Sequence, residues 1–141
     1  MQTYEKIRMP VKKKIKEEAE ITEVIIEGIL EKKGEKIVSI DFSNIQNSLF
    51  KGFIICHGNS NVHVESIADS VEELVRKKSG RKPRFIEGRS NGEWILLDYF
   101  DMVVHIFQEK FRNFYQLENL WADADLKYID SEKTTKKKAL K

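Results

Sequence analysis

The chain has 141 residues, of which 40% are hydrophobic and 34% charged, as is typical of one domain around a single buried core. Its 25 lysines and arginines almost balance its 23 aspartates and glutamates, which argues against a strongly basic nucleic-acid binder and an acidic disordered chain. No apolar run approaches the ~18 residues of a membrane span, and no secretion signal is recognisable. The single cysteine, Cys56, fits a reducing compartment. We therefore expect a cytoplasmic protein without a membrane contact.

The first half of the chain predicts one helix and two strands. Residues 1–15 are polar and basic, and we expect them to form a flexible lead-in. Apolar residues recur at helical spacing over 17–33, and Gly34 is well placed to end that helix. Residues 36–42, KIVSIDF, predict a strand. Residues 52–57, GFIICH, are apolar without alternation, which predicts a short strand covered on both faces.

The middle of the chain predicts a second helix and three further strands. The helix follows a turn at 58–61 and ends at Gly80. Its apolar stripe consists of Val64, Ile67, Ala68, Val71, Leu74 and Val75. Residues 84–87 predict a weak strand, whereas 93–98 and 102–107 predict two strong strands joined by a tight turn.

The last predicted element is a helix over 109–122. The residues available for its inner side are Phe111, Phe114, Tyr115, Leu117 and Trp121. Residues 126–141 lose periodicity and contain six lysines, so we expect a basic disordered tail. The predicted order is therefore α-β-β-α-β-β-β-α, an α/β fold in which helices pack on a mixed sheet, with a single domain over residues 16–125.

Charge is unevenly distributed along the chain. Residues 76–89 contain seven bases and one acid, a net charge of +6, whereas residues 93–125 contain seven acids and two bases, a net charge of −5. Such runs are often solvated faces. The alternative is that the acidic half meets a basic partner, which would not be nucleic acid because phosphates repel it.

Few residues have the spacing that catalysis or metal binding requires. The histidines His57, His63 and His105 do not form a metal-ligand pair by spacing. Cys56 and His57 are adjacent on a predicted strand, so their side chains point to opposite faces and do not form a nucleophile–base pair. The turn at 58–61 opens a helix, so it serves either as a plain cap or as an anion site. We expect neither a metal nor a cofactor.

The carboxy-proximal third combines acids with aromatic residues. Asp98 and Asp101 bracket the turn between the two strong strands, where aspartate is common for turn chemistry alone. The aromatic residues of this region exceed what one helix face and one hairpin need to bury: Trp94, Tyr99, Phe100, Tyr115 and Trp121. Aromatic anchors ringed by charge are typical of a protein-binding patch. An interaction protein is therefore favoured, with an enzyme and a nucleic-acid binder as alternatives.

Four stretches carry a resemblance to a known family. They are FIICHGNS (53–60), VHVESIADSVEELVR (62–76), KPRFIEG (82–88) and EWILLDYFDMVVHIFQEKFRNFYQLENLWADA (93–124). These stretches resemble the ribosomal silencing factor family, also called Iojap or RsfS. The upstream GEKIVSIDF (34–42) fits the first strand of that family, so the resemblance covers about 17–125.

The resemblance implies a translation factor that is not an enzyme. Family members dock onto protein number fourteen of the large ribosomal subunit, block joining of the small subunit, repress translation under starvation and have a role in large-subunit biogenesis. On this basis the expected partner-binding residues are Trp94, Asp98, Tyr99, Asp101, His105, Glu109, Tyr115, Leu117, Glu118 and Trp121. The lysine-rich tail would add a weak contact with ribosomal RNA, and the free protein would be a monomer or a homodimer.

The family fold is similar to that of nucleotidyltransferases, which keeps an enzyme binding nucleotide and Mg²⁺ as an alternative. That chemistry requires a carboxylate pair soon after a Gly-Ser turn. Here the turn at 58–60 is followed by Glu65 and Asp69 on a helix. The chain also departs from the family at Phe100, where glycine is common. A positive φ there would strain the backbone.

Overall fold

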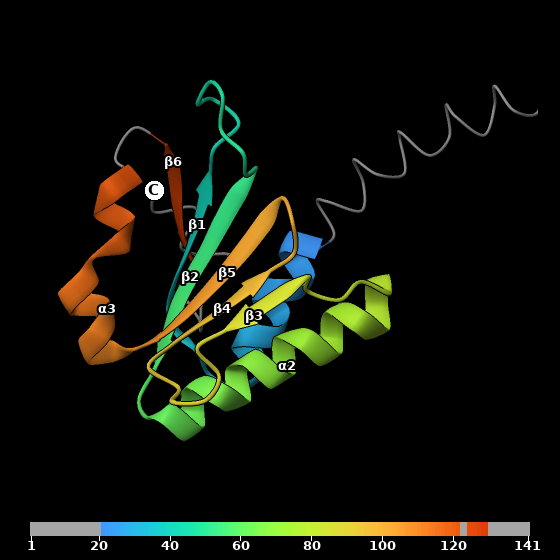
Figure 1. Cartoon of the computed structure of the whole chain (residues 1–141), viewed down its shortest axis with the longest axis vertical. Coiled ribbons are helices and arrows are strands. Elements are labelled where there is room, and N and C mark those ends of the chain that lie inside the picture. The colour runs from blue at the N-terminus through green and yellow to red at the C-terminus, as the bar shows by residue number, and fades with distance from the viewer. Residues whose placement is uncertain (1–20, 122–123, 130–141) are drawn as a thin grey trace, which may run out of the picture.

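Six strands form one mixed sheet in a computed structural model, which describes residues 21–121 and 124–129 (Figure 1). The strands are β1 (Glu35–Asp41), β2 (Gly52–Gly58), β3 (Phe85–Glu87), β4 (Trp94–Asp98), β5 (Met102–Gln108) and β6 (Asp125–Ile129). Their order across the sheet is β3-β4-β5-β2-β1-β6. β2 and β5 are parallel, and the other neighbours pair antiparallel. The predicted α/β class with a mixed sheet is confirmed.

Two helices cover one face of this sheet. The first spans residues 21–31 in the described part of the chain. α2 (Asn61–Ser79) packs against β5, β2 and β4 and runs below β3 in the view of Figure 1. Ser60 caps α2 by accepting a hydrogen bond from the His63 N–H, and Gly80 ends it with a left-handed φ of 74°. β2 is buried along its whole length, as its continuous apolar run predicts. No helix within the described residues is long and apolar enough to cross a bilayer.

The opposite face is covered only in part. The short helix α3 (Glu109–Tyr115) packs against β5 and β2 on this side, and the 3₁₀ turn η1 (Leu117–Trp121) follows it. A second apolar cluster lies beneath them, formed by Val38, Ile40, Phe42, Phe53, Ile55, Val103, Phe107 and Ala124. Because α3 and η1 are short, part of the sheet remains open on this face (Figure 1).

The single helix predicted over 109–122 is wrong, because α3 stops at Tyr115. Gln116 adopts a left-handed conformation with φ 48° and donates its backbone N–H to the Arg112 carbonyl. The chain then turns and continues as η1. Phe114, which was expected on the inner side, lies within α3 two residues past the buried Arg112, on the opposite side of the helix, and is 78% exposed.

The sheet also extends beyond the domain boundary predicted at residue 125. β6 pairs antiparallel with β1, from Ile37 opposite Ile129 to Asp41 opposite Asp125, whereas residues 126–141 were expected to form a tail. The sequence pattern missed this strand because it is polar and mostly exposed, and long-range pairing with β1 holds it. The expected lead-in at 1–15 and the rest of the tail, 130–141, lie outside the described residues.

Gly34 was expected to end the first helix through its conformational freedom, but Lys33 takes the left-handed position, with φ 59°. Gly34 instead donates its N–H to the Ile29 carbonyl at 2.9 Å. A Cβ at residue 34 would lie 2.3 Å from Ile29 Cγ2. The glycine is therefore required for close packing.

Candidate functional site

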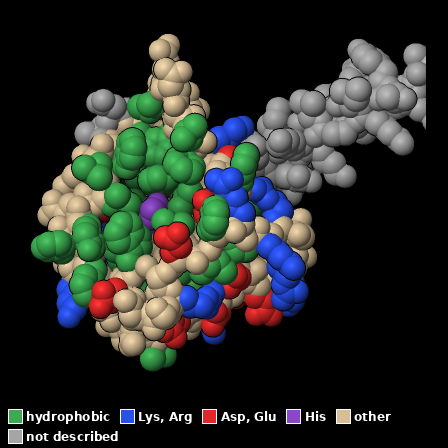
Figure 2. Space-filling model, viewed as in Figure 1, with side chains coloured by type: hydrophobic (Ala, Val, Ile, Leu, Met, Phe, Trp, Pro, Cys, Tyr) green, Lys and Arg blue, Asp and Glu red, His purple; other side chains and the backbone are tan. Residues whose placement is uncertain are grey.

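On the sheet face that α3 and η1 cover in part, five ring side chains and one leucine form a group that we call the aromatic face, of which Trp94, Leu96 and Tyr115 reach the surface. It consists of Phe53, Trp94, Leu96, His105, Phe107 and Tyr115. Strand alternation places these β4 and β5 residues on one side, because Trp94 lies opposite Phe107 and Leu96 opposite His105. Figure 2 shows hydrophobic side chains gathered around a histidine on this side of the molecule.

Ring contacts hold the aromatic face together. The Trp94 ring stacks on Phe107 with centroids 4.7 Å apart and lies 5.0 Å from the Tyr115 ring. Phe53 contacts His105 edge-on at 4.6 Å. Tyr115 is 49% exposed, so it presents about half of its surface to a partner while its other side is fixed by Trp94. Such partly exposed, well-supported rings are typical of binding hot spots.

His105 lies at the centre of this face and is neutral. Its Nδ1 accepts a hydrogen bond from Trp94 Nε1 at 3.1 Å, which leaves the proton on Nε2. Burial lowers the pKa of His105 to about 3, since its ring is only 4% exposed. Its Nε2 has no hydrogen-bond partner within the described residues. His105 therefore acts as a fixed, uncharged support beneath Trp94.

A buried arginine attaches α3 and η1 to the sheet. Arg112 donates through Nη1 to the Lys36 carbonyl at 2.7 Å and to His57 Nδ1 at 3.0 Å. Its Nε and Nη2 donate to Glu118 Oε2 at 3.1 and 2.8 Å. A register shift in β1 between Glu35 and Val38 accompanies a φ of 48° at Lys36, and the Lys36 carbonyl of this bulge meets the guanidinium.

Burial is the main cause that lowers the pKa of His57, followed by the positive charge of Arg112. His57 Nε2 lies 3.4 Å from Glu35 Oε1. The pair is therefore a neutral imidazole beside a carboxylate. Sequence reasoning did not select Arg112 as a site residue, because an arginine among aromatics on a predicted helix gives no sign that it turns inward.

The two hairpin acids lie at one end of the aromatic face and pair with the basic segment. Asp98 Oδ2 lies 3.5 Å from Arg84 Nε, and Asp101 Oδ1 lies 3.6 Å from Arg81 Nη2. Asp98 Oδ1 also accepts the Phe100 N–H at 2.7 Å. Phe100 has a φ of 88°, the strained conformation for which glycine is favoured. The chain therefore holds an aromatic ring where the backbone favours glycine.

The remaining expected residues differ in their positions. Tyr99 is 1% exposed and belongs to the core beneath the two long helices, so it lies outside the aromatic face. Leu117 and Trp121 pack against the second apolar cluster, and Glu118 pairs with Arg112. Glu109 is exposed, and no ion pair engages it within residues 21–121 and 124–129.

The turn that opens α2 is occupied by its own hydrogen bonds. The Asn59 N–H donates to His63 Nδ1 at 2.9 Å, and Ser60 Oγ accepts the His63 N–H at 3.1 Å. His63 Nε2 lies 2.7 Å from the Lys32 carbonyl and so donates to it. In the described part of the chain no three His, Cys, Asp or Glu side chains are grouped as metal ligands. Burial raises the pKa of Cys56 to about 12, which makes it a packing residue.

Comparison with known proteins identifies a family. Residues 14–141 match the family model described as ribosomal silencing factor during starvation. The chain is 34% identical over 105 residues to the ribosomal silencing factor RsfS of Halalkalibacterium halodurans, covering 74% of this chain and 88% of that protein. It is 36% identical over 100 residues to RsfS of Bacillus subtilis, covering 71% and 83%.

A solved structure of a protein from Chromobacterium violaceum is also similar, with a TM-score of 0.69 and 36% identity, covering 74% of this chain and 85% of that one. Weaker similarity extends to an Iojap-related mitochondrial protein of Arabidopsis thaliana. It also extends to the mouse mitochondrial assembly of ribosomal large subunit protein 1.

Proposed function

Because this chain belongs to the ribosomal silencing factor family, we propose that it binds the large ribosomal subunit through protein number fourteen and blocks joining of the small subunit. The block represses translation under starvation. It operates by excluded volume, so it needs occupancy of the subunit and no catalytic step. A role in large-subunit biogenesis is consistent with the name of the mouse relative, which refers to assembly of that subunit.

The observation that carries this proposal is the open aromatic face. A sheet face with Trp94, Tyr115 and Leu96 partly exposed, and with α3 and η1 leaving it uncovered, offers an apolar anchor site. Interface cores are enriched in such aromatic residues and depleted in charge. We therefore assign Trp94 and Tyr115 as the main anchors and His105 as the neutral support between Trp94 and Phe53.

Acids at the margin of the face would complement a basic partner. Glu109 is the acid most accessible to it, whereas Asp98, Asp101 and Glu118 already hold arginines of this chain. We propose that these three acids support binding indirectly. The ion pairs of Asp98 and Asp101 hold the hairpin in place, and the ion pair of Glu118 with Arg112 holds η1 in place. Leu117 and Trp121 contribute by packing η1 in place, and Tyr99 makes no contact with the partner.

Replacement of Tyr115 by alanine tests the proposal. Tyr115→Ala removes a half-exposed ring supported by Trp94 and should weaken binding to purified large subunits at least about tenfold, as for a hot-spot residue. Tyr128→Ala is the matched control, because Tyr128 is 53% exposed against 49% for Tyr115. Tyr128 lies on β6, the edge strand on the side of the sheet away from β4 and Trp94. It should change binding less than twofold.

Binding to large subunits can be measured by cosedimentation, and formation of joined ribosomes by light scattering. The unaltered chain should bind and should lower the amplitude of joining. Equal losses for Tyr115→Ala and Tyr128→Ala would remove the aromatic face from the proposal. No binding of the unaltered chain to large subunits or to isolated protein fourteen would overturn the function itself.

A further inference from the structure

The basic segment 76–89 forms a surface that the proposed function does not use. Its side chains come from the last turn of α2, the connection that follows it and the edge strand β3. In the view of Figure 2, lysines and arginines gather over the right-hand side of the molecule, where α2 ends and β3 lies. This surface adjoins the hairpin turn at Phe100, whereas Tyr115 belongs to α3 on the other side of the sheet face.

Some lysines and arginines of this segment form ion pairs with acidic side chains of neighbouring elements: Lys78 with Glu27, Arg81 with Asp101, Arg84 with Asp98, and Arg89 with Asp69 and Glu72. Arg76, Lys77 and Lys82 are exposed, and within the described residues no acid forms an ion pair with any of them. Their charges are therefore available to an anionic partner.

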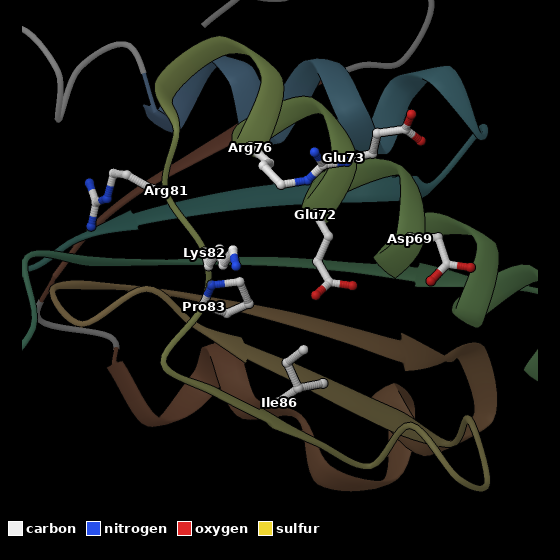
Figure 3. A pocket seen from close by; sticks show the side chains of 8 residues that line it. All are labelled: Asp69, Glu72, Glu73, Arg76, Arg81, Lys82, Pro83 and Ile86. Atoms are coloured by element: carbon white, nitrogen blue, oxygen red, sulfur yellow. The ribbon is translucent and has the colours of Figure 1, made fainter.

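A groove of about 570 Å³ lies between α2 and the chain that leads into β3 (Figure 3). Its lining residues are Asp69, Glu72, Glu73, Arg76, Arg81, Lys82, Pro83 and Ile86. Figure 3 shows Arg81 and Lys82 at the end of the groove away from Asp69. The acids Asp69 and Glu72 are engaged by Arg89, whereas Glu73 is an exposed acid one helical turn before Arg76. The end formed by Arg76, Arg81 and Lys82 still has an excess of positive charge, and it is the end that favours an anion.

Two exposed rings lie beside Arg84, and alternation along β3 places Phe85 on the face of this edge strand opposite Ile86 and the groove. Phe100 is 63% exposed and Phe85 56% exposed, and both are held by the same guanidinium. The Arg84 Cζ lies 4.6 Å from the Phe100 ring centroid and 5.6 Å from that of Phe85, within cation–π range. Exposed rings held by a guanidinium, on an edge strand flanked by unpaired lysine and arginine side chains, are what proteins use to stack nucleobases while holding phosphates.

We propose that this basic end, defined as Arg76, Lys77, Lys82, Arg84, Phe85 and Phe100, binds a single-stranded or looped segment of RNA. The side chains of Arg76, Lys77 and Lys82 contact phosphates, and the rings of Phe85 and Phe100 stack on nucleobases. An acidic protein would match the charge equally well. RNA is the better match because each nucleotide supplies both a phosphate and a flat π-face, and this surface offers complements to both.

Binding of the full chain to a fluorescent single-stranded RNA oligonucleotide tests this inference. The triple variant Arg76→Glu, Lys77→Glu, Lys82→Glu should bind at least tenfold more weakly. It should also reduce the slope of log K against log salt by about 2, since three phosphate contacts in single strands each add about 0.7. The control triple Lys33→Glu, Lys110→Glu, Lys127→Glu changes the net charge equally at exposed sites elsewhere and should weaken binding less than threefold.

Phe100→Gly tests the stacking part without endangering the fold. Glycine relieves the φ of 88° and removes the ring, and an unchanged urea-unfolding midpoint of the variant would assign any loss of affinity to the missing ring. We expect at least about fivefold weaker RNA binding, since stacking on one ring is worth about 1–3 kcal/mol. Unchanged affinity in Phe100→Gly would overturn the stacking assignment.

Two further outcomes would overturn the inference. Equal losses in both triple variants would show that only net charge matters. Displacement of the RNA by polyglutamate at equal charge concentration would assign the surface to acidic proteins. Because the assay contains no ribosomal protein, failure here leaves the proposed docking through the aromatic face intact, and failure of subunit binding leaves this inference intact.

Discussion

At the scale of single residues, the buried His105 makes the free energy of unfolding depend on pH. Its pKa is about 3 in the folded chain, against an ordinary value of 6.5. Between these values the unfolded chain binds more protons, so the free energy of unfolding falls as the pH is lowered through this window. We expect a loss of about 1–2 kcal/mol from this residue between pH 7 and pH 5, measured by urea unfolding at several pH values.

His105→Gln separates this effect from other titrations. The glutamine amide oxygen can still accept the Trp94 Nε1–H, but the side chain does not titrate. The variant should show a flatter dependence of unfolding free energy on pH. A residual slope is expected from His57, whose pKa is also lowered. If His105→Gln retained the full slope of the unaltered chain, His105 would not be its source.

Sequence patterns placed His105 correctly because strand alternation decides its face. The grouping of His105 with Val103 and Phe107 on one side of its strand is confirmed by the second apolar cluster and by ring contacts. Tyr99 lies just past the end of β4 but continues the alternation of Ile95 and Leu97, and it shares their cluster beneath the helices, so strand alternation carried one residue further would have placed it in the core. The exposure of Phe114 follows from the side of α3 that faces the sheet, which is set by the buried Arg112 and not by the apolar pattern.

At the scale of elements, the strands and helices with strong local signals were predictable. β1, β2, α2, β4 and β5 lie within about two residues of their expected bounds, because alternation, the Ser60 cap and Gly80 act locally. β6 and the break at Gln116 were missed. Both depend on contacts distant in sequence, namely pairing with β1 and the anchoring of Arg112.

Arg112→Lys tests the attachment of α3 and η1 to the sheet. Lysine keeps the charge but cannot bond the Lys36 carbonyl, His57 and Glu118 together. We expect a loss of about 3 kcal/mol in unfolding free energy, as for breaking a buried charged network, and faster hydrogen exchange over 109–121.

Arg89→Lys is the control for this variant, because Arg89 also contacts two carboxylates but lies at the surface. It should cost about 1 kcal/mol or less. Equal costs for the two variants would mean that Arg112 contributes no more than an ordinary surface pair. Large-subunit binding should fall in Arg112→Lys alone, since only this arginine holds the element that carries Tyr115.

At the scale of the whole molecule, the two oppositely charged segments meet at one edge of the sheet. Sequence analysis separated a basic segment at 76–89 from an acidic one at 93–125. The β3–β4 register then sets Arg84 beside Asp98, with the Arg84 N–H donating to the Asp98 carbonyl at 2.8 Å. The partial cancellation of charge could not be predicted, because it depends on which strands pair.

A steric mechanism makes a prediction about stoichiometry that an enzyme does not share. A protein that acts by occupying the large subunit should inhibit subunit joining in proportion to its concentration until it equals that of the large subunits, with no further effect beyond. An enzyme modifying the ribosome would instead act below equimolar amounts, and its effect would grow with time. Titration at fixed large-subunit concentration, read by light scattering at two incubation times, separates the two. Inhibition that is complete at one-tenth equivalence, or that requires added nucleotide, would favour the nucleotidyltransferase-like alternative over the docking argued from the aromatic face.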